Sequence, residues 1–140
     1  MHAPIHFERR VFWLGYSGLI PLLLASIWLL IDPGRDNVLD YVKYYAAIIL
    51  TFVGAIHWGR ALHSQQVSLL TWSVLPSLLA FACLLLPAST ALPVLAIGFI
   101  LQLMLDQHQY RQVPWFLRMR FHLTALVVLL LLVAWLMSLF

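Results

Sequence analysis

Apolar residues follow one another along this chain in five long runs, which short polar segments separate. The runs cover residues 11–31, 39–62, 67–86, 91–105 and 121–140. A helix needs about 20 mostly apolar residues to cross a bilayer, and a helix satisfies its own backbone polar groups there. The pattern therefore predicts an all-α, polytopic integral membrane protein, in which a single domain of five transmembrane helices forms a compact bundle.

Cap and turn residues mark some of the ends of these runs. The first run stops at the segment 32–34, Asp-Pro-Gly, because proline cannot continue a helix and glycine tolerates the turn that follows. Ser89 and Thr90 precede the fourth run and are candidate N-caps. Pro21 and Pro76 fall inside runs, where each removes one helical hydrogen bond. We therefore expect local distortions in the first and third helices.

The composition excludes a soluble domain. Of the 140 residues, 64% are hydrophobic and 9% are charged, whereas an ordinary soluble domain carries about 25% charged residues. The net charge of +3 does not indicate nucleic-acid binding, since the basic residues are scattered at the ends of apolar runs instead of forming a patch. We therefore expect the lipid bilayer as the surroundings of the chain, and no nucleic-acid partner.

Basic residues also predict how the bundle is oriented. One predicted side carries Arg9, Arg10, Arg60, Arg111, Arg118 and Arg120, and the other carries Arg35 and Lys43. Cytoplasmic loops hold the excess of Lys and Arg, so the N-terminus should be cytoplasmic and the C-terminus outside. The segment 1–10 is too short and too acidic for a mitochondrial presequence. These features together predict a multi-pass protein of the bacterial plasma (inner) membrane.

The second run has a face that should contact protein. Its members recur at three- and four-residue steps, namely Lys43, Ala47, Leu50, Gly54, His57 and Ala61. Ala55 and Gly59 add a pair of small residues on a neighbouring stripe, and small residues let helices approach closely in lipid. We therefore expect this helix to be central, with His57 directed at protein.

Polar residues from three runs should converge near the cytoplasmic leaflet. Arg60 ends the second run, Gln102 and Asp106 share a face at the end of the fourth, and His122 begins the fifth. An ionisable residue within a membrane span is a functional-site hypothesis by default. A partly buried pair of Arg60 with Asp106 is expected, with Arg118 and Arg120 as competitors for the carboxylate. In the alternative interpretation, Arg60 extends to the headgroups and His57 makes one structural hydrogen bond.

The histidines do not predict a metal or haem site. All six fall on the predicted cytoplasmic side, but only His2 and His6 have a four-residue spacing. A haem would need axial ligands from two facing helices, for which His57 and His122 are the only reasonable couple. The single cysteine, Cys83, lies within an apolar run and should pack as a small hydrophobic residue. We expect no metal and no cofactor.

One motif resembles a known family. The segment 49–62, ILTFVGAIHWGRAL, with Tyr-Tyr-Ala at 44–46, is similar to the second-span motif of the transmembrane protein 69 family. The segment 18–21, GLIP, resembles the first-span motif of that family, and the segment 114–118, PWFLR, together with Leu123 and Thr124, resembles its last-loop motif. The resemblance covers nearly the whole chain. It implies five spans, and it implies no activity, because the family is described as one of unknown function.

These features are compatible with two functions. The loops are short and no catalytic constellation is present in the sequence, which favours a non-enzymatic protein that acts through helix contacts as a subunit or assembly partner of a membrane complex. The alternative is a membrane binding protein for a hydrophobic or planar, tetrapyrrole-like ligand. The candidate ligand-binding residues are His57, Trp58, Arg60, Gln102, Asp106 and His122. A transporter is disfavoured because five spans without an internal repeat do not match transporter architecture.

Overall fold

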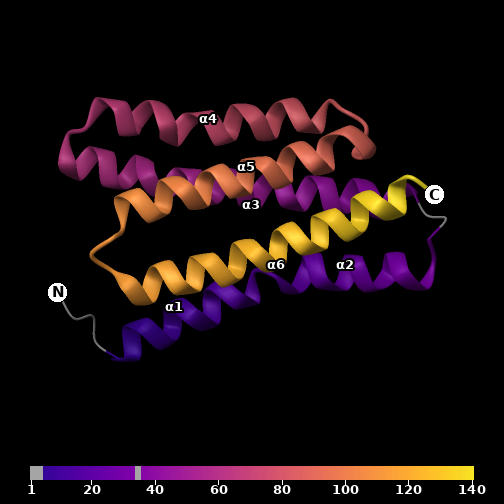
Figure 1. The fold of residues 1–140 in the computed structure, drawn as a ribbon, viewed down its shortest axis with the longest axis horizontal. Coiled ribbons are helices and arrows are strands. Elements are labelled where there is room, and N and C mark those ends of the chain that lie inside the picture. The colour runs from indigo at the N-terminus through magenta and orange to yellow at the C-terminus, as the bar shows by residue number, and fades with distance from the viewer. Residues whose placement is uncertain (1–4, 34–35) are drawn as a thin grey trace.

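The computed structural model describes residues 5–33 and 36–140, and within them all regular secondary structure is helical. The helices are α1 (Ile5–Ser17), α2 (Ile20–Ile31), α3 (Asp36–Ser64), α4 (Val67–Leu84), α5 (Ala88–Gln109) and α6 (Pro114–Ser138) (Figure 1). Because α1 and α2 together make one span, five segments are long and apolar enough to cross a membrane. The predicted all-α, five-span bundle is confirmed. His2, Arg35 and the glycine at position 34 of the predicted Asp-Pro-Gly stop lie outside the described residues.

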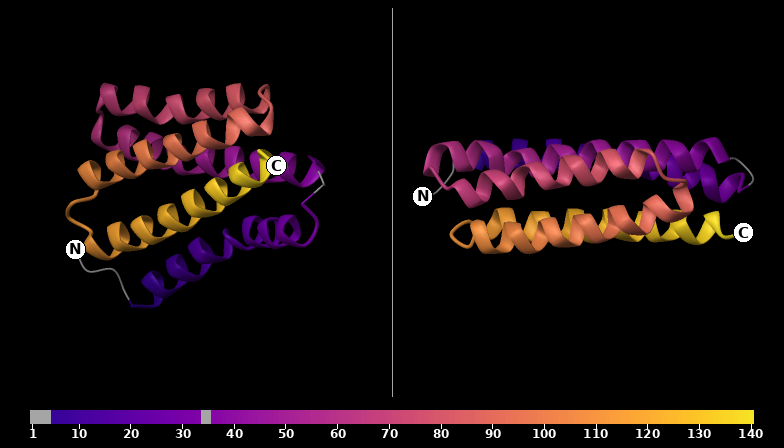
Figure 2. Two further views of the ribbon diagram at one scale, coloured as in Figure 1. Left: turned by 45° about the vertical axis from the view of Figure 1, so that its right-hand side comes forward. Right: turned by 90° about the horizontal axis from the view of Figure 1, so that it is seen from above.

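The helices form two layers. Figure 2 shows α2, α3 and α4 in one layer and α5 and α6 in the other. The apolar core lies between these layers and includes Leu22, Leu50, Leu95, Phe99 and Leu131, which are all fully buried. α1 begins and α6 ends at opposite ends of the bundle (Figure 1), as an odd number of spans requires.

The first span is broken between α1 and α2. Helical hydrogen bonding is interrupted at Gly18 and Leu19, and α2 starts with Pro21 in its first turn, where a missing N–H costs least. The Tyr45 hydroxyl of α3 donates a hydrogen bond to the Gly18 carbonyl, which the break leaves free. The two helices therefore meet at an angle (Figure 1), and α1 diverges from the rest of the layer.

The helices differ from the predicted runs at several ends, and two of these differences change the account of individual residues. α6 begins at Pro114 instead of at residue 121, so Arg118 and Arg120 lie within its first two turns. Proline is favoured at the start of a helix, which explains the earlier boundary. The prediction that Ser89 and Thr90 cap the fourth helix is wrong. Pro87 occupies the N-cap, and no side-chain hydrogen bond caps this end.

The expected face of α3 is confirmed. Lys43, Ala47, Leu50, His57 and Ala61 are all buried. Burial of Lys43 is compensated by its ammonium group, which donates a hydrogen bond of 2.9 Å to the Leu86 carbonyl just beyond the end of α4.

Close packing of α3 on α4 depends on Gly54. A Cβ atom there would lie 2.8 Å from both Cβ and Cγ of Pro76. The stripe of Ala55 and Gly59 is different, because both residues are exposed and a Cβ atom at Gly59 would meet nothing within 4 Å. Within the described chain, Gly54 and not that stripe brings these helices together.

We expect Gly54→Ala to destabilise the bundle. The added methyl group collides with the rigid Pro76 ring, and overpacking of this kind costs about 1–3 kcal/mol. Thermal unfolding in detergent measures the effect. The matched control is Gly59→Ala, which gains helix propensity without a clash. A Gly54→Ala melting temperature equal to or above that of the wild type would contradict this account of the packing.

Candidate functional site

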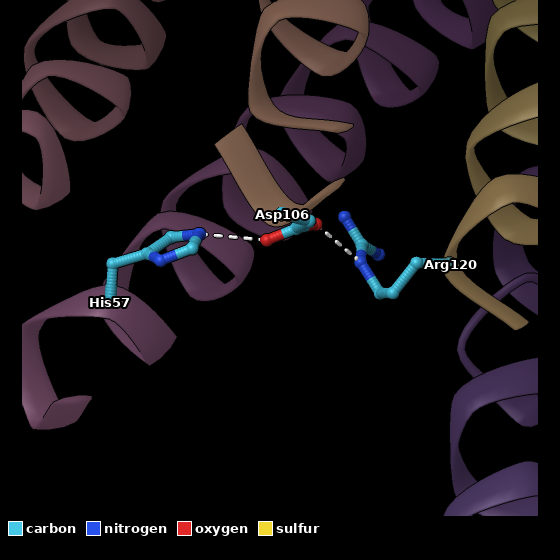
Figure 3. Close-up of polar contacts among 3 residues, drawn as sticks. All are labelled: His57, Asp106 and Arg120. Carbon is cyan, nitrogen blue, oxygen red and sulfur yellow. Dashed lines mark hydrogen bonds and ion pairs between the residues drawn. The ribbon is translucent and has the colours of Figure 1, made fainter. Parts of the chain in front are cut away.

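Three buried ionisable side chains from three helices meet near the end of the bundle where α1 begins. His57 of α3 lies with Nε2 2.7 Å from Asp106 Oδ1, and Arg120 of α6 donates its Nε–H to Asp106 Oδ2 at 2.8 Å (Figure 3). The exposed fractions are 0% for His57, 2% for Asp106 and 7% for Arg120. We call these three residues, together with Gln102 and Thr124, the polar cluster.

The antiparallel packing of α5 on α6 assembles this cluster. Gln102 and Asp106 are one turn apart on α5, and Arg120 and Thr124 are one turn apart on α6. Two contacts set the register of the pair, the Asp106–Arg120 hydrogen bond and the Tyr110–Phe116 ring contact, with ring centroids 5.0 Å apart. Continuing this register by one turn brings Gln102 and Thr124 to the same level, and both are buried.

The charges of the cluster balance around Asp106. A single ionised group in a membrane interior is costly, and a partner that donates hydrogen bonds reduces the cost. An ionised carboxylate only accepts hydrogen bonds, so the Nε2–H group of His57 is the donor to Asp106. Nδ1 is the ring nitrogen that takes no part in this bond. Each carboxylate oxygen therefore receives one donor, from α3 on one side and from α6 on the other (Figure 3).

The expected pairing of Arg60 with Asp106 is wrong. The Arg60 guanidinium lies over the Tyr110 ring, with its Cζ atom 4.6 Å from the ring centroid. Because α6 begins early, Arg120 stands opposite Asp106 and takes the carboxylate. The pKa of the Tyr110 phenol is raised, mainly because the side chain is partly buried. The phenol is therefore neutral at physiological pH, and Arg60 makes a cation–π contact with an uncharged ring.

Two other candidate residues lie away from the cluster. Trp58 is 46% exposed on the outer surface of α3, and His122 is exposed on α6 with its ring against Phe121. His57 is fully buried whereas His122 is exposed, so the structure does not bring these two side chains together as axial ligands. No three His, Cys, Asp or Glu residues among those described are grouped so as to hold a metal ion.

The sequence prediction named Thr124 only in a family motif and not as a site residue, and it treated Arg120 only as a competitor for the carboxylate. The available signal was the four-residue spacing of Arg120 and Thr124, which mirrors that of Gln102 and Asp106. Four buried polar atoms of the cluster have no hydrogen-bond partner within the described protein: His57 Nδ1, Gln102 Nε2, Arg120 Nη2 and Thr124 Oγ1. Buried polar groups are nearly always hydrogen-bonded, so these atoms have unused capacity to bind a ligand.

Two of these residues border a cavity of about 350 Å³. The cavity lies between the α1–α2 span and α3, and α6 forms its floor. Its lining is apolar except for Arg120 and Thr124 at one end and for Tyr45, whose hydroxyl donates to the Gly18 carbonyl. The deep wall includes Leu22, Phe99 and Val127. Trp58 is not among the lining residues. A pocket of this kind, mostly apolar with a few polar groups at one end, is the usual form of a small-molecule site.

We expect Asp106→Asn to destabilise the protein because it leaves Arg120 as an unpaired buried charge. Breaking a buried pair costs about 3–5 kcal/mol. Adding Arg120→Gln should recover part of the loss, whereas adding Arg60→Gln should recover none, because Arg60 contacts Tyr110. Thermal unfolding in detergent at fixed pH measures each variant, with Arg118→Gln as an exposed control on α6. Recovery by Arg60→Gln but not by Arg120→Gln would contradict the observed pairing.

Comparison with known proteins gives one finding about descent. No curated protein and no solved structure matches this chain. A family model described as "Protein of unknown function (DUF3429)" matches residues 7–136, nearly the whole chain. The match agrees with the unknown function that the sequence resemblance implied, and the transmembrane protein 69 name itself stays a resemblance. The chain therefore belongs to the DUF3429 family of proteins of unknown function.

Proposed function

We propose that this protein is a non-enzymatic binding protein for a hydrophobic ligand within the membrane. The observation that carries the proposal is the apolar cavity of about 350 Å³ that ends at two buried polar residues with unpartnered atoms, Arg120 and Thr124. Ligand pockets in proteins typically measure about 300–1,000 Å³ and combine apolar walls with a few polar groups that fix the orientation of the ligand. Both properties are present here.

The lining of the cavity also supports entry from the lipid phase. Leu14 of α1 and Phe52 of α3 belong to the lining, yet they are 74% and 67% exposed on the lipid-facing surface. The cavity is therefore accessible between α1 and α3, where the break at Gly18 separates the two helices. α1 has no buried residue, so little packing energy opposes a small outward movement of α1 as a ligand enters.

We place the protein in the bacterial inner membrane, with the polar cluster in the cytoplasmic leaflet. The excess of arginine at the end of the bundle where α1 begins supports this orientation. A reporter fused after Phe140 should then be active only if it functions outside the cytoplasm. Activity of a reporter that requires the cytoplasm, in the same fusion, would reverse the orientation.

A role as subunit or assembly partner is the second candidate. The observation in its favour is the exposed stripe of Ala55 and Gly59, where open space surrounds Gly59. Small residues on a lipid-facing surface allow a helix of another protein to approach closely. Under this hypothesis, Gly59→Leu should reduce the recovery of a specific membrane protein in pull-downs from native membranes. Equal recovery with wild-type protein would remove the support for this role.

The binding function predicts saturable labelling of the cavity. A dodecane probe that carries a photoreactive diazirine should insert into the buried lining residues Leu22 and Phe99 on irradiation, and mass spectrometry locates the insertion. Val127→Phe fills the cavity and should abolish labelling of these two residues. Leu129→Phe, on the exposed face of α6, should leave labelling unchanged. Labelling of lipid-facing residues alone, or an equal effect of the two variants, would contradict a binding cavity.

A further inference from the structure

We infer that the ligand presents a neutral hydrogen-bond acceptor, a carbonyl oxygen at the end of a hydrocarbon chain, to Arg120 and Thr124. This inference rests on the proposed binding function and specifies the chemical class of the ligand. Three features of the cavity carry it: the hydrogen-bonding capacity that remains on these two side chains, the charge balance at Arg120, and the apolar walls that lead away from them.

Arg120 borders this end of the cavity and has hydrogen-bonding capacity that the described protein does not use. Arg120 uses Nε–H for Asp106, and its Nη2 has no partner within the described protein. Guanidinium nitrogens only donate, so the group that satisfies Nη2 must be an acceptor. A ligand atom with lone pairs, placed at this end, supplies it.

The Thr124 hydroxyl differs from other hydroxyl groups in these helices. Ser26 and Thr51 donate to the carbonyl four residues earlier, and Ser73 donates to the carbonyl three residues earlier. Thr124 is buried and makes no such bond. Threonine has two accessible χ1 rotamers in a helix, and Thr124 lines the cavity, so rotation about χ1 is the movement that presents its hydroxyl to a ligand there. Thr124 is thus a second donor for the same acceptor.

Charge balance excludes an anionic head group. Arg120 is the only charged residue among the described residues that line the cavity, and Asp106 already neutralises it at 2.8 Å. A carboxylate or phosphate bound there would add an uncompensated negative charge in an apolar site, which is strongly unfavourable. A carbonyl oxygen accepts the same hydrogen bonds without adding charge. A plain hydrocarbon leaves both donors unsatisfied.

The walls indicate where the rest of the molecule lies. Beyond Thr124 the floor of the cavity continues along α6 to Val127, and Phe99 and Leu22 face it from α5 and α2. All of these residues are buried and apolar. The carbonyl therefore lies at the polar cluster, and the hydrocarbon chain extends toward the middle of the bundle.

Three photoreactive probes with one chain length test the inference: a diazirine-bearing dodecane, the corresponding methyl ketone and the corresponding carboxylate. Labelling of Leu22 and Phe99 is measured against probe concentration for the full chain in vesicles of dialkyl-ether phosphatidylcholine, which contains no carbonyl groups. We expect the ketone to half-saturate at a concentration about tenfold lower than the other two probes, the factor for one hydrogen bond from a charged donor. Equal affinities of the ketone and the dodecane, or tighter binding of the carboxylate, would overturn the inference.

Variants separate the role of the hydroxyl group from a general effect on folding. Thr124→Val removes an unpartnered hydroxyl, so its melting temperature should equal or exceed that of the wild type while the ketone loses part of its advantage over dodecane. Thr51→Val, whose hydroxyl bonds to Ala47 and does not line the cavity, is the matched control and should keep the advantage. The double change Asp106→Asn with Arg120→Met keeps the site neutral and leaves the Thr124 hydroxyl as the remaining donor, so it should reduce the preference for the ketone. Full preference in Thr124→Val and in this double variant would exclude both donors.

The source of the carbonyl is resolved by repeating the measurement in vesicles of diacyl phosphatidylcholine. Competition by this lipid against the ketone probe identifies a lipid ester as the occupant, and undiminished labelling identifies a free carbonyl compound. Both results support the inference. If no probe labels Leu22 and Phe99 saturably, the binding function itself fails, whereas saturable labelling by all three probes with equal affinity leaves that function intact and rejects only the carbonyl class.

Discussion

A carboxylate that lies between membrane-spanning helices needs donors from its neighbours, because no bulk water reaches it. Asp106 obtains one donor from α3 and one from α6, so a single side chain on α5 ties three helices together at one end of the bundle. The direction of these contacts sets the rotation of each helix about its axis. His57 faces inward on α3, and Arg120 faces α5 near the start of α6. Packing along the rest of the helices is apolar and less directional, so the polar cluster contributes much of the specificity of the arrangement.

The cavity follows from a second local feature, the break in the first span. A continuous helix from α1 to α2 could pack along α3 over its whole length. Interruption at Gly18, held by the Tyr45 hydroxyl, directs α1 away from α3 and leaves an apolar space above α6. Arg120 contributes to both features, because its Nε completes the Asp106 pair while the same side chain borders the cavity. Helix assembly and the proposed binding site are therefore physically coupled through one residue.

This coupling explains why a small membrane protein can retain unpartnered polar atoms. A fully satisfied cluster would stabilise the bundle and have no capacity to bind a ligand. Here the charges of Asp106 and Arg120 are paired, whereas Arg120 Nη2 and the Thr124 hydroxyl have no partner within the described protein. The energetic cost of unpartnered donors is modest compared with that of an unpaired charge. A ligand that accepts hydrogen bonds therefore gains affinity from donors whose partners are not supplied by the protein.

The sequence by itself determined the class of the fold, because the length and composition of an apolar run decide whether it spans a bilayer. It also determined the buried face of α3, including His57, since helical periodicity places those residues on one side. The ends of the helices were predicted less well than their existence. Because the stretch before residue 121 is polar, the start of α6 at Pro114 was not predicted, and Arg120 was assigned to the region before the helix.

Only the tertiary structure decided which cation meets Asp106. From the sequence alone, three arginines were comparable partners for this carboxylate, namely Arg60, Arg118 and Arg120. Which of them pairs with it depends on the register between α5 and α6 and on the position of Tyr110. The cavity was equally inaccessible to sequence reasoning, because its walls come from five helices and its volume depends on the angle between α1 and α2. Periodicity reports which side of one helix is buried. It does not report the distance between helices, and that distance decides both the ion pair and the cavity.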